Sequence, residues 1–215
     1  MEEAVRYNRF LLSELVRWAA GLQSVLDFGA GNGRFALALR ERGVEVAALE
    51  PDPLLAGAIR ARGVAAFGSL EELGMRRLDG IYSINVLEHL EDDRAVLAAF
   101  RRRLATGGRL FLYVPAFPIL FSANDTRVGH LRRYRRRELV ARVREAGFAV
   151  ESARHVDSLG FAAGLGYRLF GRRDGGLDPA KVRLYDSTVF PLSRRLDRLC
   201  DRFFGKNLLL RASAR

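Results

Sequence analysis

Cysteine and lysine are scarce in this chain of 215 residues. Cys200 is the only cysteine, so the sequence excludes an intramolecular disulfide and any site built from several cysteines. A lone cysteine is also typical of a protein from a reducing compartment. Of the 36 basic residues only Lys181 and Lys206 are lysines, and all the others are arginines.

Long hydrophobic runs are missing as well. The longest apolar stretch, 161–170, is interrupted by glycines and by Arg168, and it is far shorter than the roughly 18 residues that a membrane span needs. The first residues, Met1-Glu2-Glu3, are acidic where an export signal would be basic and then apolar. We therefore expect a cytoplasmic protein, and we leave open peripheral contact with the inner membrane face.

Acidic residues are outnumbered by basic ones, which gives a formal net charge of +11. Between Arg127 and Arg144 there are eight arginines and a single acid, Glu138. Such a cluster is either a solvated face or a contact surface for an anionic partner, such as a phosphorylated substrate, an acidic membrane or nucleic acid. The hydrophobic content of 49% is enough for a sizeable core, so we do not expect intrinsic disorder.

Strands and helices alternate along the chain. Short apolar runs predict strands at 24–28, 44–49, 64–67, 78–84, 109–114, 148–156 and 208–212. Helical spacing of apolar residues predicts helices at 2–20, 34–42, 54–61, 92–104, 136–146 and 192–204, and 157–190 is expected to be less regular. This alternation predicts an α/β fold, a Rossmann-like, doubly wound, mostly parallel seven-stranded sheet with helices on both faces.

The whole chain, 1–215, is expected to form a single domain. It would consist of an N-terminal helix (1–21), a ligand-binding core (22–156), a cap made of two segments (115–135 and 157–190), and a C-terminal helix with the last strand (191–215). In sheets of this kind the ligand lies beyond the carboxyl ends of the strands.

The most informative segment is Val25-Leu-Asp-Phe-Gly-Ala-Gly-Asn-Gly-Arg34, where a strand leads through a glycine-rich turn into a helix. Glycines let the backbone adopt positive φ and approach a ligand closely, and the N-terminus of the helix favours anionic groups. Glu50 follows at the end of the second strand. A carboxylate there can accept hydrogen bonds from both ribose hydroxyls of a nucleoside cofactor.

The glycine spacing distinguishes between cofactors. Dinucleotide-binding turns read Gly-x-Gly-x-x-Gly, whereas this turn reads Gly-x-Gly-x-Gly. Asp27, two residues before the first glycine, would repel a pyrophosphate and would suit a cofactor with an ammonium group or another positive centre. The segment resembles the first motif of the class I S-adenosylmethionine-dependent methyltransferases, a hydrophobic strand followed by Asp/Glu-x-Gly-x-Gly-x-Gly.

Two further segments extend this resemblance over roughly residues 24–156, most closely to the ubiquinone-biosynthesis-like group (methyltransferase types 11, 12 and 23). Asn85-Val-Leu-Glu-His89-Leu-Glu-Asp-Asp93 is similar to the segment that this group carries after the fourth strand. Gly129-His-Leu-Arg-Arg-Tyr134, followed by Arg137-Glu-Leu139 and Glu145-Ala-Gly-Phe148, is similar to its segment leading into the sixth strand.

The resemblance implies S-adenosylmethionine as the cofactor, bound by Asp27, Gly29, Ala30, Gly31, Gly33, Glu50, Pro51, Ser69, Leu70, Asn85 and Val86. It implies that Asp27 and the turn hold the methionine half of the cofactor and that Glu50 binds the ribose. Pro51 and Asp52 would flank the adenine.

The same resemblance implies that Asn85 to Leu87 pass close to the sulfonium and its methyl group. After the third strand the family often has an acid near the adenine amine, and here Ser69 stands at that place. The hydroxyl of Ser69 or the backbone of Leu70 would have to replace this contact.

Three residues are candidates for assisting the transfer, an in-line displacement at the methyl carbon in which positioning supplies much of the rate. A base is needed where the acceptor is a hydroxyl, and His89, at the end of the fourth strand, is the first candidate. His130 and Tyr134 lie in a loop that is expected to fold over the substrate, where they would orient the substrate or relay a proton. We interpret His155, near the end of the sixth strand, as structural.

No metal site is predicted. Metal-assisted methyl transfer to catechols needs clustered carboxylates after the fourth and fifth strands, and Val114-Pro-Ala-Phe117 follows the fifth. The acids at 91–93 are better explained as the start of a helix.

The expected cap is apolar, with Phe117, Ile119, Leu120, Phe121, Phe161, Leu165, Tyr167 and Phe170. Arginines edge it at positions Arg127, Arg132, Arg133, Arg168, Arg172 and Arg173. An apolar lining with a basic rim would suit an amphiphilic acceptor with an anionic head, although core packing explains the aromatic residues equally well.

Taken with the resemblance, these features predict S-adenosylmethionine-dependent methyl transfer to a small-molecule or lipid-linked acceptor, by O-methylation. An RNA methyltransferase is an alternative that the arginine cluster motivates, but the chain has neither an appended RNA-binding module nor an Asn-Pro-Pro-Tyr-type run after the fourth strand. A non-catalytic cofactor-binding protein of the same fold is a second alternative. The glycine spacing and Asp27 disfavour a nicotinamide-dependent oxidoreductase. The oligomeric state is not predicted.

Overall fold

The computed structural model describes residues 3–74, 77–170, 174–176 and 178–215. Its strands form one seven-stranded sheet in the order β3-β2-β1-β4-β5-β7-β6. The strands are β1 (Ser24–Phe28), β2 (Glu45–Leu49), β3 (Ala65–Phe67), β4 (Leu78–Ile84), β5 (Leu104–Pro115), β6 (Phe148–Val156) and β7 (Asn207–Ala214). Strands β1 to β5 pair in parallel, and β7 runs antiparallel between β5 and β6. The predicted Rossmann-like α/β fold is confirmed.

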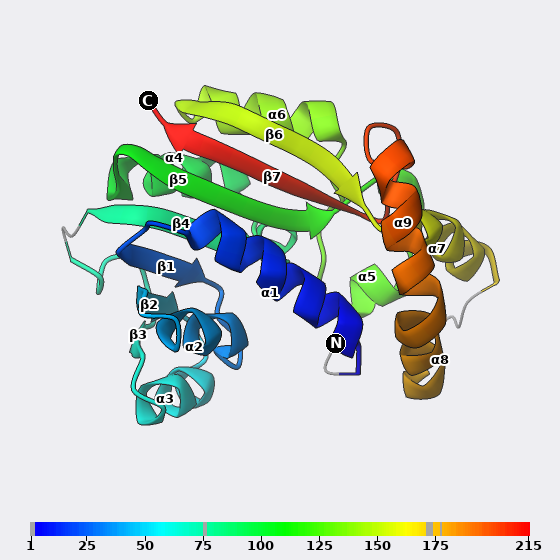
Figure 1. Cartoon of the computed structure of the whole chain (residues 1–215), viewed down its shortest axis with the longest axis horizontal. Helices are drawn as coiled ribbons and strands as arrows, with labels where there is room; N and C mark the ends of the chain where they lie inside the picture. Colours follow the sequence, from blue (N-terminus) through cyan, green and yellow to red (C-terminus); the bar gives the residue numbers. More distant parts are fainter. Residues whose placement is uncertain (1–2, 75–76, 171–173, 177) are drawn as a thin grey trace.

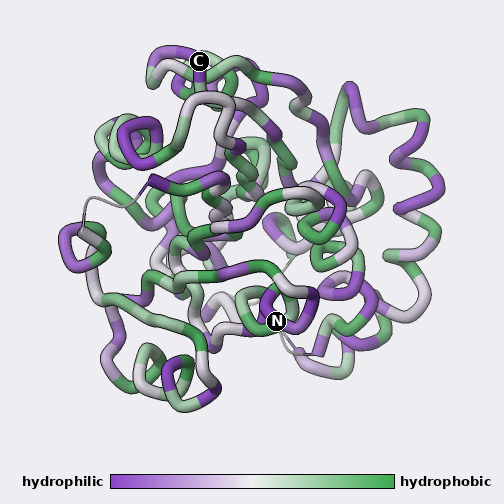
Figure 2. The backbone as a smooth tube through the Cα atoms, turned by 60° about the vertical axis from the view of Figure 1, so that its left-hand side comes forward, coloured by the Kyte–Doolittle hydropathy of each residue, from purple (hydrophilic) through white to green (hydrophobic). Residues whose placement is uncertain are grey.

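Helices cover both faces of this sheet (Figure 1). One face carries α1 (Val5–Ala19), α2 (Arg34–Arg40) and α3 (Pro53–Ala61), and the other carries α4 (Asp93–Arg103) and α6 (Arg136–Glu145). Successive side chains of a strand point to opposite faces, so Val25 packs in the same cluster as Trp18 of α1, whereas Leu26 packs in that of Phe100 of α4. Hydrophobic residues accordingly run along the central strands in Figure 2, with mixed hydropathy along the surrounding helices.

The region 157–190, expected to be less regular, is largely helical, so that prediction was wrong. It forms α7 (Ser158–Phe170), α8 (Pro179–Leu184) and a π-helical turn, η3 (Tyr185–Val189), which continues into α9 (Phe190–Cys200). Three glycines lower the intrinsic helix propensity of α7. Tertiary contacts stabilise the helix despite this low propensity. The carboxylate of Asp197 accepts hydrogen bonds from the backbone N–H groups of Asp157 (2.9 Å) and Ser158 (2.8 Å), so these donors at the start of α7 are satisfied.

Helix α1 connects this helical cap to the sheet. Ala4 provides no side-chain cap for α1; instead, the Asp186 carboxylate of η3 accepts from the backbone N–H groups of Arg6 (2.7 Å) and Tyr7 (2.8 Å). Further along α1, the buried Glu14 pairs with Arg211 of β7 at 2.7 Å. The first helix is therefore fixed to both parts.

The carboxyl ends of β1, β4 and β5 lie at the same end of the sheet. Short elements surround it: η1 (Leu87–His89), η2 (Pro118–Leu120) and α5 (Ala123–Arg127). Helix α5 lies between the start of α1 and the group of α7, α8 and α9 (Figure 1). In the described part of the chain, no helix combines the length and the apolarity that a membrane span requires.

Candidate active site

The glycine turn after β1 adopts a conformation that only glycines accommodate well. Gly29, Gly31 and Gly33 have φ of +79°, +55° and +73°, in the left-handed region that side chains disfavour. A Cβ on Gly29 would lie 2.3 Å from Cγ2 of Val86, and one on Gly33 would lie 2.8 Å from Cγ1 of Ile59. Nothing lies within 4 Å of a Cβ built on Gly31. The turn is therefore pressed against Val86, just after β4, and against α3, and it is open at Gly31.

Asp27 is a buried carboxylate with an unused oxygen at the end of β1. Asp27 is only 3% exposed, and its Oδ2 has no hydrogen-bond partner. Burial raises the pKa of Asp27 to about 7, and the Tyr82 hydroxyl and the Ala36 backbone offset only part of this rise. A cation placed here would restore the charged form.

Glu50 faces the same turn from the end of β2. Its Oε2 accepts from the backbone N–H of Gly31 at 2.7 Å and its Oε1 from that of Asp52 at 3.0 Å. Asp52 in turn caps α3 by accepting from Leu54 N at 2.8 Å. Asp27 and Glu50 therefore stand on two neighbouring strands, with the turn between them, as the sequence predicts.

The other residues predicted to contact the cofactor follow the carboxyl ends of β1, β2, β3 and β4. Asn85 has φ of +54° and donates its backbone N–H to Tyr113 O at 2.8 Å, which turns the chain after β4 toward Val86 and the glycine turn. The Ser69 hydroxyl hydrogen-bonds the Glu71 carboxylate and holds the pKa of that group below its usual range. The Leu70 carbonyl accepts from Arg103 at 2.6 Å. Ala30 donates its backbone N–H to Leu49 O at 3.0 Å, and Pro51 is exposed.

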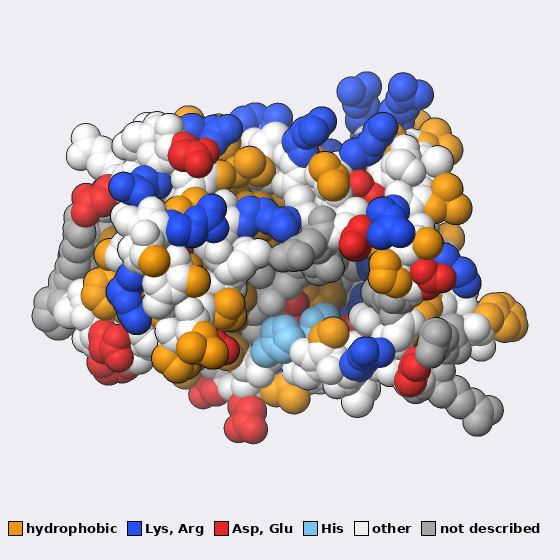
Figure 3. Space-filling model, turned by 90° about the horizontal axis from the view of Figure 1, so that it is seen from below, with side chains coloured by type: hydrophobic (Ala, Val, Ile, Leu, Met, Phe, Trp, Pro, Cys, Tyr) orange, Lys and Arg blue, Asp and Glu red, His pale blue; other side chains and the backbone are white. Residues whose placement is uncertain are grey.

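A second group of residues gathers beyond β4, where Glu88, His89 and His130 each place a ligand-type atom within 4.8 Å of the others. The two imidazole rings meet edge to face, with centroids 4.8 Å apart. Glu88 is fully buried and neither of its carboxylate oxygens has a hydrogen-bond partner; burial raises its pKa to about 8. Figure 3 shows histidine side chains beside a hollow on one face of the molecule. The sequence named both histidines but overlooked Glu88.

Asp125 of α5 orients this group, and the sequence analysis missed it. Its Oδ1 accepts from Nδ1 of His130 at 2.7 Å, and the Arg133 guanidinium binds both carboxylate oxygens, at 2.8 and 3.1 Å. Burial would raise the pKa of Asp125, but the hydrogen bonds from His130 and Arg133 outweigh it and lower the pKa to about 2. A signal was present in Ser122-x-x-Asp125, which forms a capping box at the start of α5.

Tyr134 was expected to lie over the substrate, but its side chain does not reach the surface. It is fully buried, and its hydroxyl donates to Asp93 Oδ2 at 2.7 Å and to Leu87 O at 3.1 Å. Burial and the neighbouring Asp93 raise its pKa, so the hydroxyl keeps its proton. The hydrogen bond of Tyr134 to Leu87 holds η1 in place. We therefore interpret Tyr134 as a positioning residue, and not as one that orients the substrate or relays a proton.

Comparisons with known proteins agree with this geometry. A family model described as a methyltransferase domain matches residues 2–153. The chain belongs to this methyltransferase family.

Individual relatives are more distant. An uncharacterized methyltransferase of Mycobacterium tuberculosis is 31% identical over 126 residues, which cover 55% of this chain and 49% of the relative. A ubiquinone biosynthesis O-methyltransferase of Xanthomonas oryzae pv. oryzae is 31% identical over 98 residues, 41% of each chain. The chain spans about half the length, or less, of these curated relatives. A SAM-dependent methyltransferase from Archaeoglobus fulgidus has the same fold, with a TM-score of 0.66 at 18% identity over 99% of this chain and 94% of that one.

S-adenosylmethionine is the cofactor of this family, and the residues around the glycine turn fit it. The unpartnered Oδ2 of Asp27 suits the cofactor's ammonium group, and the Glu50 carboxylate can exchange its backbone partners for ribose hydroxyls. The turn admits a ligand at Gly31, where no atom crowds the backbone. When bound, S-adenosylmethionine supplies an activated methyl group on a sulfonium leaving group.

The predicted cap residues divide into two sets. Phe117 stacks on His155 with centroids 4.9 Å apart and meets Phe161 edge to face at 5.1 Å, whereas Ile119 and Phe170 are 53% and 88% exposed. His155 also places Nδ1 3.1 Å from Asp201 O, which supports its structural interpretation.

The basic rim needs a correction too. Arg133 is buried on Asp125 and does not belong to it, and Arg142 of the same arginine cluster is paired with Asp93 and Glu138. Part of that cluster is therefore structural. Arg172 and Arg173 lie outside the described residues.

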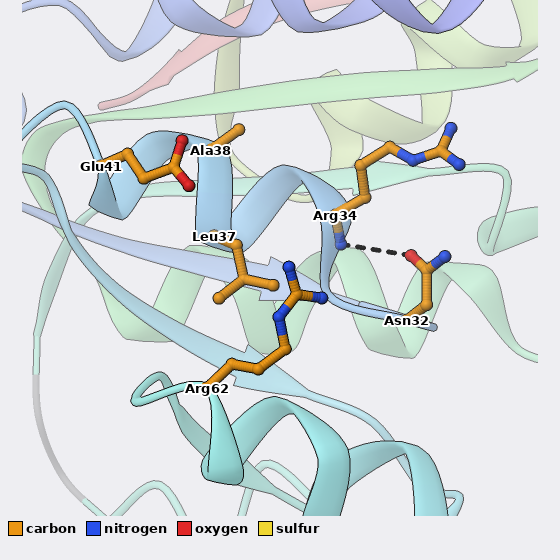
Figure 4. Close-up of a pocket in the computed structure, with 6 residues that line it drawn as sticks. All are labelled: Asn32, Arg34, Leu37, Ala38, Glu41 and Arg62. Carbon is orange, nitrogen blue, oxygen red and sulfur yellow. Dashed lines mark hydrogen bonds between the residues drawn. The ribbon is translucent and has the colours of Figure 1, made fainter. Parts of the chain in front are cut away.

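One hollow of the surface belongs to neither group. It encloses about 300 Å³ and is lined by Asn32, Arg34, Leu37, Ala38, Glu41 and Arg62 (Figure 4). None of the residues predicted to bind the cofactor lines it, so we do not assign it to the active site.

Proposed function

We propose that this methyltransferase transfers the methyl group of S-adenosylmethionine to a hydroxyl oxygen of a small-molecule or lipid-linked acceptor. The cofactor half rests on Asp27 and Glu50, which flank the glycine turn. The acceptor half rests on Glu88, His89 and His130, which follow Val86, the residue packed against that turn. Donor and acceptor would thus meet at the end of β4.

The observation that carries the choice of a hydroxyl is the orientation of His130. Its Nδ1 hydrogen is committed to Asp125, so Nε2 carries a lone pair, and it lies 3.7 Å from Glu88 Oε1. A neutral imidazole of this kind can take up the proton of a hydroxyl, whereas an acceptor atom without a hydrogen, such as a thioether sulfur or a tertiary amine nitrogen, would not require a base. In the transfer the acceptor's O–H bond breaks and an O–CH₃ bond forms while the C–S bond breaks, and S-adenosylhomocysteine leaves.

The cap supports an amphiphilic acceptor. Phe117 and Phe161 offer aromatic surface, and Arg168, whose guanidinium bonds the Ile119 carbonyl, lies at the edge of the same region. Large apolar side chains are also exposed on the neighbouring helices, including Leu184 (63%) and Leu199 (76%). Together with the net charge of +11, they support peripheral contact with an acidic membrane, where a lipid-linked acceptor would be found.

Two measurements test the proposal. Calorimetry with S-adenosylmethionine should show binding to the wild type and to Glu41→Ala, a control just after the end of α2, and none to Asp27→Ala or Glu50→Ala. A transfer assay with labelled methyl groups against lipid, quinone and sugar-linked fractions should then label a hydroxyl. Undiminished affinity in both variants would remove the cofactor assignment, whereas labelling of an amine or a carbon would remove the choice of oxygen.

A further inference from the structure

The group beyond β4 has a feature that acid–base chemistry alone does not explain. Glu88 is fully buried, yet both of its carboxylate oxygens lack a hydrogen-bond donor. Burying a carboxylate without partners is costly, and Nε2 of the neighbouring His130 lies 3.7 Å from Oε1, beyond hydrogen-bond distance. The cavity side of Glu88 therefore offers two unused oxygen ligands.

Both neighbouring histidines are held with one nitrogen committed elsewhere. Nδ1 of His130 bonds the Asp125 carboxylate at 2.7 Å, and Nδ1 of His89 lies 3.1 Å from the carbonyl oxygen of Gly129. A carbonyl only accepts, so Nδ1 of His89 carries the hydrogen and its Nε2 is left with a lone pair. A metal-ligating histidine commonly donates its second N–H to a carboxylate or a backbone carbonyl, which fixes the tautomer and the ring.

From this geometry we propose that Glu88, His89 and His130 bind one divalent transition-metal ion of the Zn²⁺ type. Two imidazoles and one carboxylate form a ligand set that such ions take in proteins, with a fourth position left open for substrate or water. Ligands about 2.1 Å from a shared zinc ion lie ~3.5 Å apart, close to the 3.7 Å between His130 and Glu88. The ligand-type atoms of all three residues lie within 4.8 Å of one another, and His89 is the exposed member.

The inference deepens the proposed function, on which its chemical role rests. With the ion bound, Nε2 of His130 acts as a ligand instead of a base, and a hydroxyl bound at the open position would lose its proton to solvent more readily and present its oxygen to the methyl group. The binding of the ion does not depend on that role, because the ligands are present whatever the acceptor is.

The test is metal binding by the untagged full chain, freed of metal and without S-adenosylmethionine. Titration with Co²⁺, followed by its visible absorption, and calorimetry with Zn²⁺ should give one site per chain. Glu88→Gln and His130→Asn should each weaken binding at least tenfold. The matched control is His155→Asn, which changes the third histidine of the chain and should leave the affinity unchanged.

Glu88→Gln removes a buried unpaired carboxylate and should not harm folding, which circular dichroism checks. Absence of saturable binding, or equal affinity in all three variants, would overturn the inference. Co²⁺ binding without any methyl transfer would leave the metal site standing and remove the proposed function. Methyl transfer that persists unchanged in protein shown to contain no metal would remove the role of the ion.

Discussion

The cofactor half and the acceptor half of this site are built in different ways. The cofactor half uses one continuous turn, 28–33, whose glycines let the backbone itself form the surface, with carboxylates at the ends of β1 and β2. The acceptor half uses side chains from η1, α5 and the following loop, held in place by ion pairs such as that of Asp125 with Arg133. The first depends on the absence of side chains and the second on their pairing.

The largest expected effect on cofactor binding tests the backbone half. Gly29→Ala would place a Cβ 2.3 Å from Val86 at a φ of +79°, so the turn must shift. We expect a loss of S-adenosylmethionine affinity of about 100-fold or more and a loss of ~2–4 kcal/mol of stability.

Gly31→Ala is the matched control for stability, because its Cβ would meet nothing within 4 Å. It should cost only about 1 kcal/mol, the price of a left-handed alanine. Chemical denaturation and calorimetry measure both variants. If they lose equal stability, the contact with Val86 does not constrain the turn.

The second prediction tests the paired half. Arg133→Ala removes the guanidinium that binds both oxygens of the fully buried Asp125. Breaking a buried ion pair costs about 3–5 kcal/mol. The neighbouring Arg132, whose side chain is 27% exposed and 3.5 Å from Asp93, should lose less than ~1 kcal/mol on change to alanine. Similar melting temperatures for the two variants would mean that Arg133 is not structural.

These two halves also differ in what the sequence could predict. The glycine turn, Asp27 and Glu50 occupy strand ends whose order follows from local patterns, so their approach could be predicted. The pairing of Asp125 with His130 and the burial of Glu88 depend on where α5 and η1 pack. The local hydrophobic pattern of the sequence does not predict this packing. Helix α7 was missed for a related reason. Its glycines disfavour a helix, and the hydrogen-bond acceptor for the backbone N–H groups at its start is Asp197, a residue of the distant α9.

A third prediction uses the charge of Asp27. Tyr82 of β4, Glu50 of β2 and the Ala36 backbone of α2 face this group, and its pKa is about 7 in the free protein. The cofactor's ammonium needs the ionised carboxylate, so affinity should fall about tenfold for each pH unit below 7 and level off above it. Calorimetry from pH 5.5 to 8 measures this. Asp27→Asn should bind weakly at every pH, and an equally steep profile in that variant would assign the titration to another group.

The same shift predicts how stability varies with pH. The raised pKa means that the folded chain holds this proton more tightly than the unfolded chain between about pH 4 and 7. The contribution of Asp27 to stability therefore declines as the pH rises through this window, by on the order of 4 kcal/mol. Asp27→Asn should remove the decline, so that at pH 8 the variant without cofactor unfolds at a higher temperature than the wild type.

The smallest expected effect separates positioning from catalysis at Tyr134. Tyr134→Phe deletes the hydrogen bonds to Asp93 and Leu87, but Asp93 keeps its pairing with Arg142. The stability loss should therefore be about 1 kcal/mol, with S-adenosylmethionine affinity unchanged. Because the hydroxyl only holds η1 in place, the methyl-transfer rate should fall by less than about tenfold and keep its wild-type pH profile. A proton relay would instead lose on the order of 10²-fold or more, and such a loss without unfolding would restore Tyr134 to the reacting groups.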